Sequence, residues 1–102
     1  MDTRGFNLKL NKIKQERHIA DSPNYVDGRS ILTSDPEMLL SLYAGVGTPI
    51  NVDGAWFNKE RFTHNDFIGI WKSPDGKISK KTRNGIIHYS KENGMHIVPA
   101  QP

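Results

Sequence analysis

Residues 85–99 read Gly-Ile-Ile-His-Tyr-Ser-Lys-Glu-Asn-Gly-Met-His-Ile-Val-Pro, and this stretch decides the fold. Two apolar runs flank a Glu-Asn-Gly sequence that is typical of a turn. The pattern predicts a β-hairpin with strands at 86–90 and 95–98. Because side chains alternate along a strand, one face should carry Ile87, Tyr89, Met95 and Ile97. We expect that face to be buried.

The opposite face of this hairpin carries the candidate chemistry. Alternation gives it His88, Ser90 and His96, although the sequence alone does not set the register between the two strands. Histidine transfers protons in both directions near neutrality. RNA cleavage by internal transesterification needs a base for the 2′-hydroxyl, an acid for the departing 5′-oxygen and cations for the charge on the phosphorane. Two histidines with Lys, Arg and Ser nearby supply these roles without a metal.

The residues before the hairpin predict further antiparallel strands and a helical part. Ser34-Asp35-Pro36-Glu37 has the spacing of a capping box, which predicts a helix over 34–44 that ends at Gly45 and Gly47. Its apolar stripe would be Met38, Leu39, Leu42 and Tyr43. Residues 10–19 favour a helical turn with Lys14 and His18 on one face. Strands are expected at 55–62, 67–71 and 77–82, a loop at 48–54, and turns at 73–76 and 84–85.

These elements predict one α+β domain. Its N-terminal helical part would pack on a four- or five-stranded antiparallel sheet. We expect a flexible N-terminus at 1–6 and a single domain at 7–102. The 102 residues suffice for one modest core.

Composition narrows the function. Cysteine is absent, which excludes disulfides, thiolate zinc sites and cysteine nucleophiles. No apolar run is long enough to cross a bilayer, and we expect neither a signal peptide nor a membrane partner. Residues 1–18 hold five basic and two acidic side chains, residues 72–91 six and one, and residues 19–71 three and seven. Two basic ends would form a basic face that attracts phosphate or acidic protein, if the fold brings them together; a mixed solvated surface is the alternative.

Other readings of the same residues are weaker. His18, His88 and His96 lack the spacing of a metal motif, so we expect no metal. Ser90 lies in no GxSxG elbow, and His64 lies in turn-like sequence where we expect it to be solvated. Trp56 and Trp71 are suited either to base stacking or to the core, and the core is the better assignment for Trp71.

The order of several segments is more specific than any single residue. Lys14-Gln15-Glu16-Arg17-His18-Ile19 is followed by Gly28-Arg29-Ser30-Ile31-Leu32, Asp35-Pro36 and Tyr43-Ala44-Gly45-Val46-Gly47. The chain then closes with the hairpin and Ala100-Gln101-Pro102. From about residue 7 onward this order resembles the polymorphic toxin type 50 domain. Glu92-Asn93 makes a longer final turn than that family has, and residues 55–66 also differ.

The resemblance implies a ribonuclease toxin of the barnase-like and EndoU-like class, active without metal or cofactor. It implies catalytic roles for His18, His88, Ser90 and His96. It also implies phosphate or orientation contacts from Lys14, Gln15, Arg29 and Lys91. The expected partners are RNA and an acidic immunity protein, with action in the cytoplasm of a target bacterium. Similar segments end some phage head-morphogenesis proteins. An inactive module bound to phage head proteins and a non-catalytic RNA-binding domain are therefore the alternatives.

Overall fold

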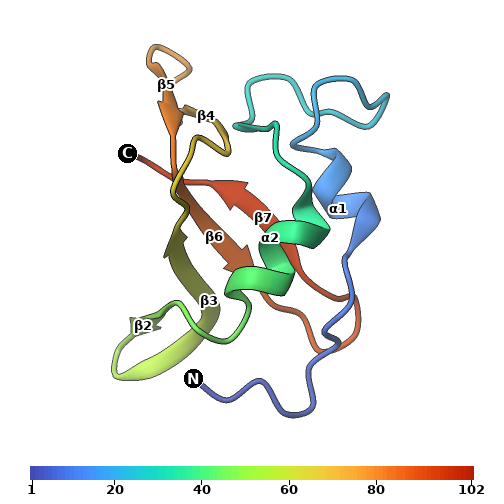
Figure 1. Cartoon of the computed structure of the whole chain (residues 1–102), viewed down its shortest axis with the longest axis vertical. Helices are drawn as coiled ribbons and strands as arrows, with labels where there is room; N and C mark the ends of the chain where they lie inside the picture. The colour runs from blue at the N-terminus through green and yellow to red at the C-terminus, as the bar shows by residue number, and fades with distance from the viewer.

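Seven strands form two antiparallel sheets in the computed structural model, which describes residues 1–102 (Figure 1). The four-stranded sheet has the order β2-β3-β6-β7, and the three-stranded sheet has the order β1-β4-β5. The elements are α1 (Lys12–Glu16), β1 (Ile31–Leu32), α2 (Pro36–Tyr43), β2 (Thr48–Val52), β3 (Ala55–Thr63), β4 (Gly69–Lys72), β5 (Ser79–Thr82), β6 (Asn84–His88) and β7 (His96–Pro99). The mixed helix and sheet content confirms the predicted α+β character, but the strands belong to two sheets rather than one.

The β6–β7 hairpin forms as the sequence predicts. The register pairs Ile87 with Ile97 and His88 with His96. Ile87, Tyr89, Met95 and Ile97 are all buried, and they form the main core together with Leu39, Phe62 and Ile68. Burial of this face leaves His88, His96 and Val98 on the opposite face, where each is partly exposed.

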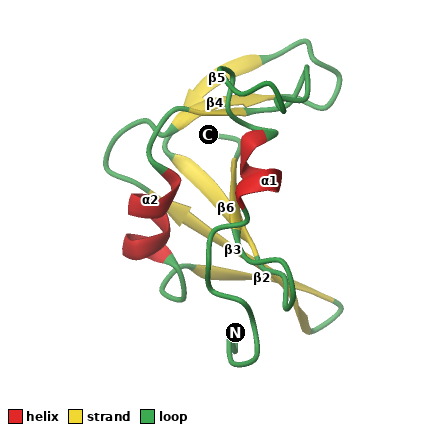
Figure 2. Ribbon diagram, turned by 90° about the vertical axis from the view of Figure 1, so that its right-hand side faces the viewer, coloured by secondary structure: helices red, strands yellow, loops and turns green.

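Helix α2 covers the buried face of the four-stranded sheet (Figures 1 and 2). Its N-cap is Asp35, whose carboxylate accepts the Glu37 N–H at 3.0 Å, so Ser34 is not the cap. Leu39 and Leu40 are buried, whereas Met38 and Leu42 are exposed. The predicted stripe was therefore wrong by part of a turn, because the helix turns Leu40 rather than Leu42 toward the sheet.

Two predicted non-strand segments are strands. Residues 48–52, expected in a loop, form β2 and pair with β3 through a turn at Asp53 and Gly54. Asn84 and Gly85, expected in a turn, begin β6. Only Arg83 separates β5 from β6, so the chain passes from one sheet into the other without reversing. A Cβ at Gly85 would lie 2.5 Å from the Phe62 ring, so this glycine permits close packing rather than a turn.

The outer edge of β7 is closed by the N-terminal segment. Leu10 forms a parallel bridge with Met95, whose N–H donates to the Lys9 carbonyl at 2.7 Å. Two residues further along this edge, at Ile97, the hydrogen bonds come from the Gln15 side chain. Its Oε1 accepts the Ile97 N–H at 2.7 Å, and its Nε2 donates to the Ile97 carbonyl at 2.9 Å. This side-chain amide holds α1 against β7. Figure 1 shows the helix beside the strand.

A buried carboxylate organises the other side of the sheet. Glu60 of β3 accepts the N–H groups of Gly45 and Gly47 at 2.7 and 2.9 Å and the hydroxyl of Tyr89. A Cβ at Gly47 would lie 2.6 Å from the Arg61 carbonyl oxygen, so only glycine allows this approach. Glu60 therefore fixes the loop between α2 and β2.

Neither helix is long and apolar enough to cross a membrane.

We expect Gln15→Ala to destabilise the protein by about 2 kcal/mol or more, because it leaves both polar groups of the buried Ile97 backbone without a partner. Denaturant unfolding measures this change. Ile13→Ala is the control on the same helix, since Ile13 is 70% exposed and should change stability by less than about 0.5 kcal/mol. Equal effects of the two substitutions would show that the amide does not hold α1 in place.

Candidate functional site

Three histidine rings lie in a row across β6, β7 and the turn after α1. His88 and His96 are direct partners in the β6–β7 ladder, and their ring centroids are 4.7 Å apart. The His96 ring stacks on the His18 ring at 6.1 Å with an interplanar angle of 19°. Histidines from residues 18, 88 and 96 thus meet at one place, with His96 in the middle of the row.

His18 owes its position to the contacts of α1. Gln15 docks the helix on β7, and one turn later the His18 carbonyl accepts the Leu32 N–H at 2.7 Å. The buried His18 ring contacts the Ser30 carbonyl through Nδ1 at 2.9 Å. Since a carbonyl oxygen only accepts, Nδ1–H must donate, and the neutral ring keeps an unprotonated Nε2. His18 is therefore held in the tautomer that leaves Nε2 free to accept a proton.

The same face carries cations from β3. The β3–β6 register pairs Lys59 with His88 and Arg61 with Ile86, so Lys59 continues the histidine row across the sheet. A cavity of about 330 Å³ lies over this row, and it includes Lys14 from α1, Ser90 and Asn58. None of the side chains that line it is acidic. The cavity is therefore suited to an anion.

Burial and positive neighbours hold the three imidazoles neutral. Desolvation, followed by the charges of His96, Lys59, His18 and Lys14, lowers the pKa of His88 to about 3. Desolvation, with His18 and Lys14 next in effect, lowers the pKa of His96 to about 4. Burial also lowers the pKa of His18, although the Ser30 carbonyl partly opposes the shift. No carboxylate is among the groups that shift these pKa values, so nothing nearby favours the protonated form of the rings by charge.

A local irregularity in β3 forms the rim of this cavity. The β2–β3 register shifts between Ile50 and Asn51, and Asn58 adopts a left-handed conformation with φ 60°. The Asn58 carbonyl accepts the Tyr89 N–H at 2.9 Å, and the Trp56 indole donates to the Lys59 carbonyl at 2.8 Å. Strain of this kind often marks a functional position. Here it sets the direction of β3 just before Lys59.

The structure brings some of the predicted site residues together and separates others. His88, His96, Ser90 and Lys14 line one cavity, with His18 at the end of the row. Ser90 Oγ also accepts the Asn93 N–H at 3.1 Å, so it supports the hairpin turn as well.

The remaining three predicted residues lie at different places. Arg29 lines a second cavity on the far side of His18. Gln15 is buried with both polar atoms bound to Ile97, which leaves it an orientation role and no free atom for substrate. Lys91 is outside both cavities, with its Nζ 5.7 Å from the Phe6 ring.

Lys59 and Arg61, which lie on this face, are not among the site residues predicted from the sequence. The signal was present in the predicted strand, where Lys59 and Arg61 alternate with the buried Glu60 and Phe62. Without the β3–β6 register, however, this alternation could not be connected to His88.

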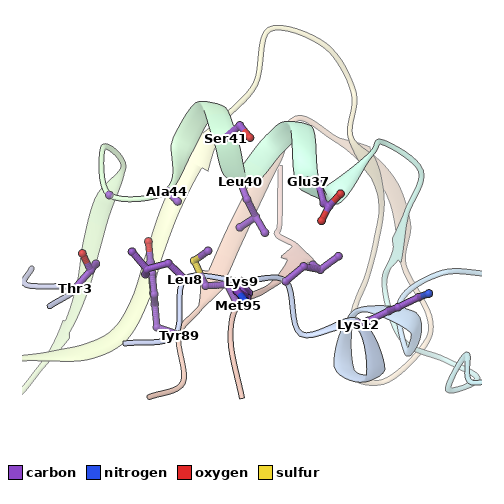
Figure 3. A pocket seen from close by; sticks show the side chains of 12 residues that line it. Thr3, Leu8, Lys9, Lys12, Glu37, Leu40, Ser41, Ala44, Tyr89 and Met95 are labelled. Atoms are coloured by element: carbon purple, nitrogen blue, oxygen red, sulfur yellow. The ribbon is translucent and has the colours of Figure 1, made fainter. Parts of the chain in front are cut away.

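Two further features of the chain bear on the site. Another cavity, of about 710 Å³, lies between α2 and the N-terminal segment (Figure 3). It is lined by side chains such as Leu8, Leu40 and Met95 and contains no histidine, so it is not the candidate site. No group of three or more histidine or carboxylate side chains is arranged to hold a metal ion.

The depressed pKa values predict a specific pH dependence of stability. The unfolded chain binds protons at its imidazoles below about pH 6.5, whereas folded His88 and His96 do so only near 3 and 4. Protons therefore favour the unfolded chain, and stability present above pH 6.5 should fall as the pH drops toward 4. The slope per histidine is at most about 1.4 kcal/mol per pH unit, and less because both rings are partly exposed.

Chemical unfolding between pH 4 and 7 measures this slope. The double substitution His88→Gln/His96→Gln should flatten it, whereas the control Ile13→Ala, which removes no titratable group from an exposed position, should leave it unchanged. Equal slopes in all three proteins would contradict the assigned shifts.

Comparison with protein families identifies the family of this chain. The family described as bacterial toxin 50 matches residues 10–99, which include all three histidines of the row and both strands of the hairpin. A comparison with curated proteins finds no match. Because the family match covers most of the chain, the chain belongs to the bacterial toxin 50 family and is a toxin domain.

Proposed function

We propose that this toxin domain is a metal-independent endoribonuclease that cleaves RNA by acid–base transesterification. The observation that carries the proposal is the row of three imidazoles, His18, His96 and His88, on a face whose nearby charges are positive. Phosphate is the anion that such a face attracts. RNA supplies its own nucleophile, the 2′-hydroxyl, so histidines suffice for the proton transfers.

The reaction needs two proton transfers. A base removes the proton of the 2′-hydroxyl, the 2′-oxygen attacks phosphorus, and the bond from phosphorus to the 5′-oxygen breaks. An acid gives its proton to that 5′-oxygen, which leaves a 2′,3′-cyclic phosphate. We assign the base to His18, because its Nδ1–H is held by Ser30 and its Nε2 is free. His88, at the other end of the row, is the acid, and His96 is the alternative partner for either role.

Substrate binding provides the conditions for the acid. Desolvation is the main cause of the low pKa of His88, and the neighbouring cations add to it. A phosphodiester in the cavity offsets those cations and favours a protonated imidazole. Proton uptake by His88 is thereby linked to RNA binding.

Cations beside the row stabilise the charge of the transition state. Lys14 and Lys59 line the cavity with His88, and Ser90 offers a hydroxyl to the phosphate. Arg29 and Lys91, which lie farther along, would bind the RNA backbone on either side. The chain also has few internal partners for its cations, since its one ion pair joins Arg4 to Asp2. Unpaired cations favour a polyanionic partner.

The toxin family gives this activity a setting. A ribonuclease toxin acts on RNA in the cytoplasm of a target bacterium. The cell that makes it needs an immunity protein, and an acidic protein that covers the cationic histidine face would block the cavity.

We expect His88→Ala to lower RNA cleavage by at least about 100-fold, because a general acid or base contributes about 10²–10⁴-fold. The assay follows a labelled RNA with purified protein in EDTA. His64→Ala is the control, since His64 lies outside both cavities, where its Nδ1 contacts the Tyr43 hydroxyl at 2.6 Å. Rates are compared per folded molecule because this control loses that contact.

Four outcomes would contradict the proposal. Equal cleavage by the two variants would remove His88 from the mechanism. Loss of activity in EDTA with rescue by one metal would replace the mechanism. RNA that is bound but never cleaved would indicate a non-catalytic binding domain, and RNA neither bound nor cleaved would favour a phage head or other protein-interaction module.

A further inference from the structure

A second cavity continues the histidine face beyond His18. Its volume is about 650 Å³, and His18 forms part of its wall. Its lining includes Ile86 and Val98, which are partners in the β6–β7 ladder and lie two residues along each strand from His88 and His96, on the same face of the sheet. The catalytic row and this cavity are therefore adjacent on one surface.

The walls of this cavity combine an aromatic ring with cations. Trp71 and Lys72 come from β4, Arg61 from β3, and Arg29 from the segment before β1. Asp27 is the one acidic side chain in the lining, against three cations. The half-buried Trp71, together with Ile86 and Val98, offers apolar surface. The cavity thus has one part suited to a flat apolar group and another suited to a negative charge.

Two of these cations, Arg61 and Lys72, are positioned by polar contacts at the wall of the cavity. Arg61 Nη2 donates to the Gln101 carbonyl at 2.8 Å, and the Lys72 Nζ lies 3.4 Å from the Tyr25 hydroxyl. The Lys72 backbone N–H donates to Ser30 Oγ at 2.9 Å, and the Ser30 carbonyl receives the His18 ring. Ser30 therefore connects the wall of the second cavity directly to the histidine row.

We propose that this second cavity binds the nucleotide that adjoins the scissile phosphate. The base would lie on Trp71 over Ile86 and Val98, and the neighbouring phosphate would contact Arg29, Arg61 and Lys72. The volume lies within the range of about 300–1,000 Å³ that is typical of small-ligand sites. The inference rests on the proposed ribonuclease function, and it makes single-stranded RNA of at least three nucleotides the preferred substrate.

The test measures binding rather than cleavage. A labelled trinucleotide of 2′-O-methyl RNA lacks the nucleophilic hydroxyl and stays intact on the wild-type protein. Replacing one terminal nucleotide by an abasic residue should weaken its binding by about 5- to 100-fold at one end of the chain, the range expected for the loss of one stacked base. In Trp71→Leu that penalty should disappear. A purely structural role of Trp71 would instead weaken both ligands equally and overturn the proposal.

A second variant tests the phosphate contacts and does not depend on the folding of Trp71→Leu. Arg29→Ala/Arg61→Ala should bind the trinucleotide at least about 10-fold more weakly than Lys80→Ala/Lys81→Ala. That control removes the same charge from exposed positions of β5, outside the cavity. Equal affinities of the two double variants would overturn the proposal. A wild-type protein that binds the trinucleotide at this cavity but cleaves no RNA would contradict the proposed function and leave the cavity assignment intact.

Discussion

The pairing of the Gln15 amide with the Ile97 backbone is the interaction on which the site depends. Strand β7 is the edge of its sheet, and an open edge exposes unpaired N–H and C=O groups. Gln15 supplies a donor and an acceptor at this edge, as a further strand would, but from a helix. The consequence is functional as well as structural, because α1 then carries Lys14 and His18 to His96. Through this contact, a histidine near the N-terminus and two near the C-terminus share one site.

The two faces of the four-stranded sheet differ in charge. On the covered face, the buried carboxylate of Glu60 is satisfied by two backbone N–H groups and by the Tyr89 hydroxyl. On the opposite face, the cavity lined by Lys59, His88 and His96 contains no carboxylate, and burial with positive neighbours lowers the pKa values of these two histidines. The carboxylate on one face therefore has all its hydrogen-bond partners within the protein. The lysines on the other face, Lys14 and Lys59, line an open cavity. The proposed binding of phosphate rests on this difference between the two faces.

The sequence predicted those features that depend on neighbouring residues. Alternation along the hairpin was sufficient to place Ile87 and Ile97 in the core and His88 and His96 outside it. The local pattern gave the wrong structure where pairing between distant residues determines the fold. Asn84-Gly85 resembles a turn, yet Gly85 lies within a sheet, where Phe62 packs against it. Lys59 was missed for the same reason, since only the β3–β6 register places it beside His88. Gln15 was expected to be near the site, but its contact with the edge of β7 requires the position of α1, which local pattern does not give.

Titration of the histidine imidazole signals by NMR tests the central claim most directly, because it reports on the three rings themselves. In the free protein, the pKa values of His18, His88 and His96 should lie well below 6.5, with His88 and His96 near 3 and 4. Added inorganic phosphate should raise the pKa values of His88 and His96, because it supplies the counter-charge that the face lacks. Ordinary values near 6.5 that phosphate does not move would contradict an anion-binding acid–base centre at this row.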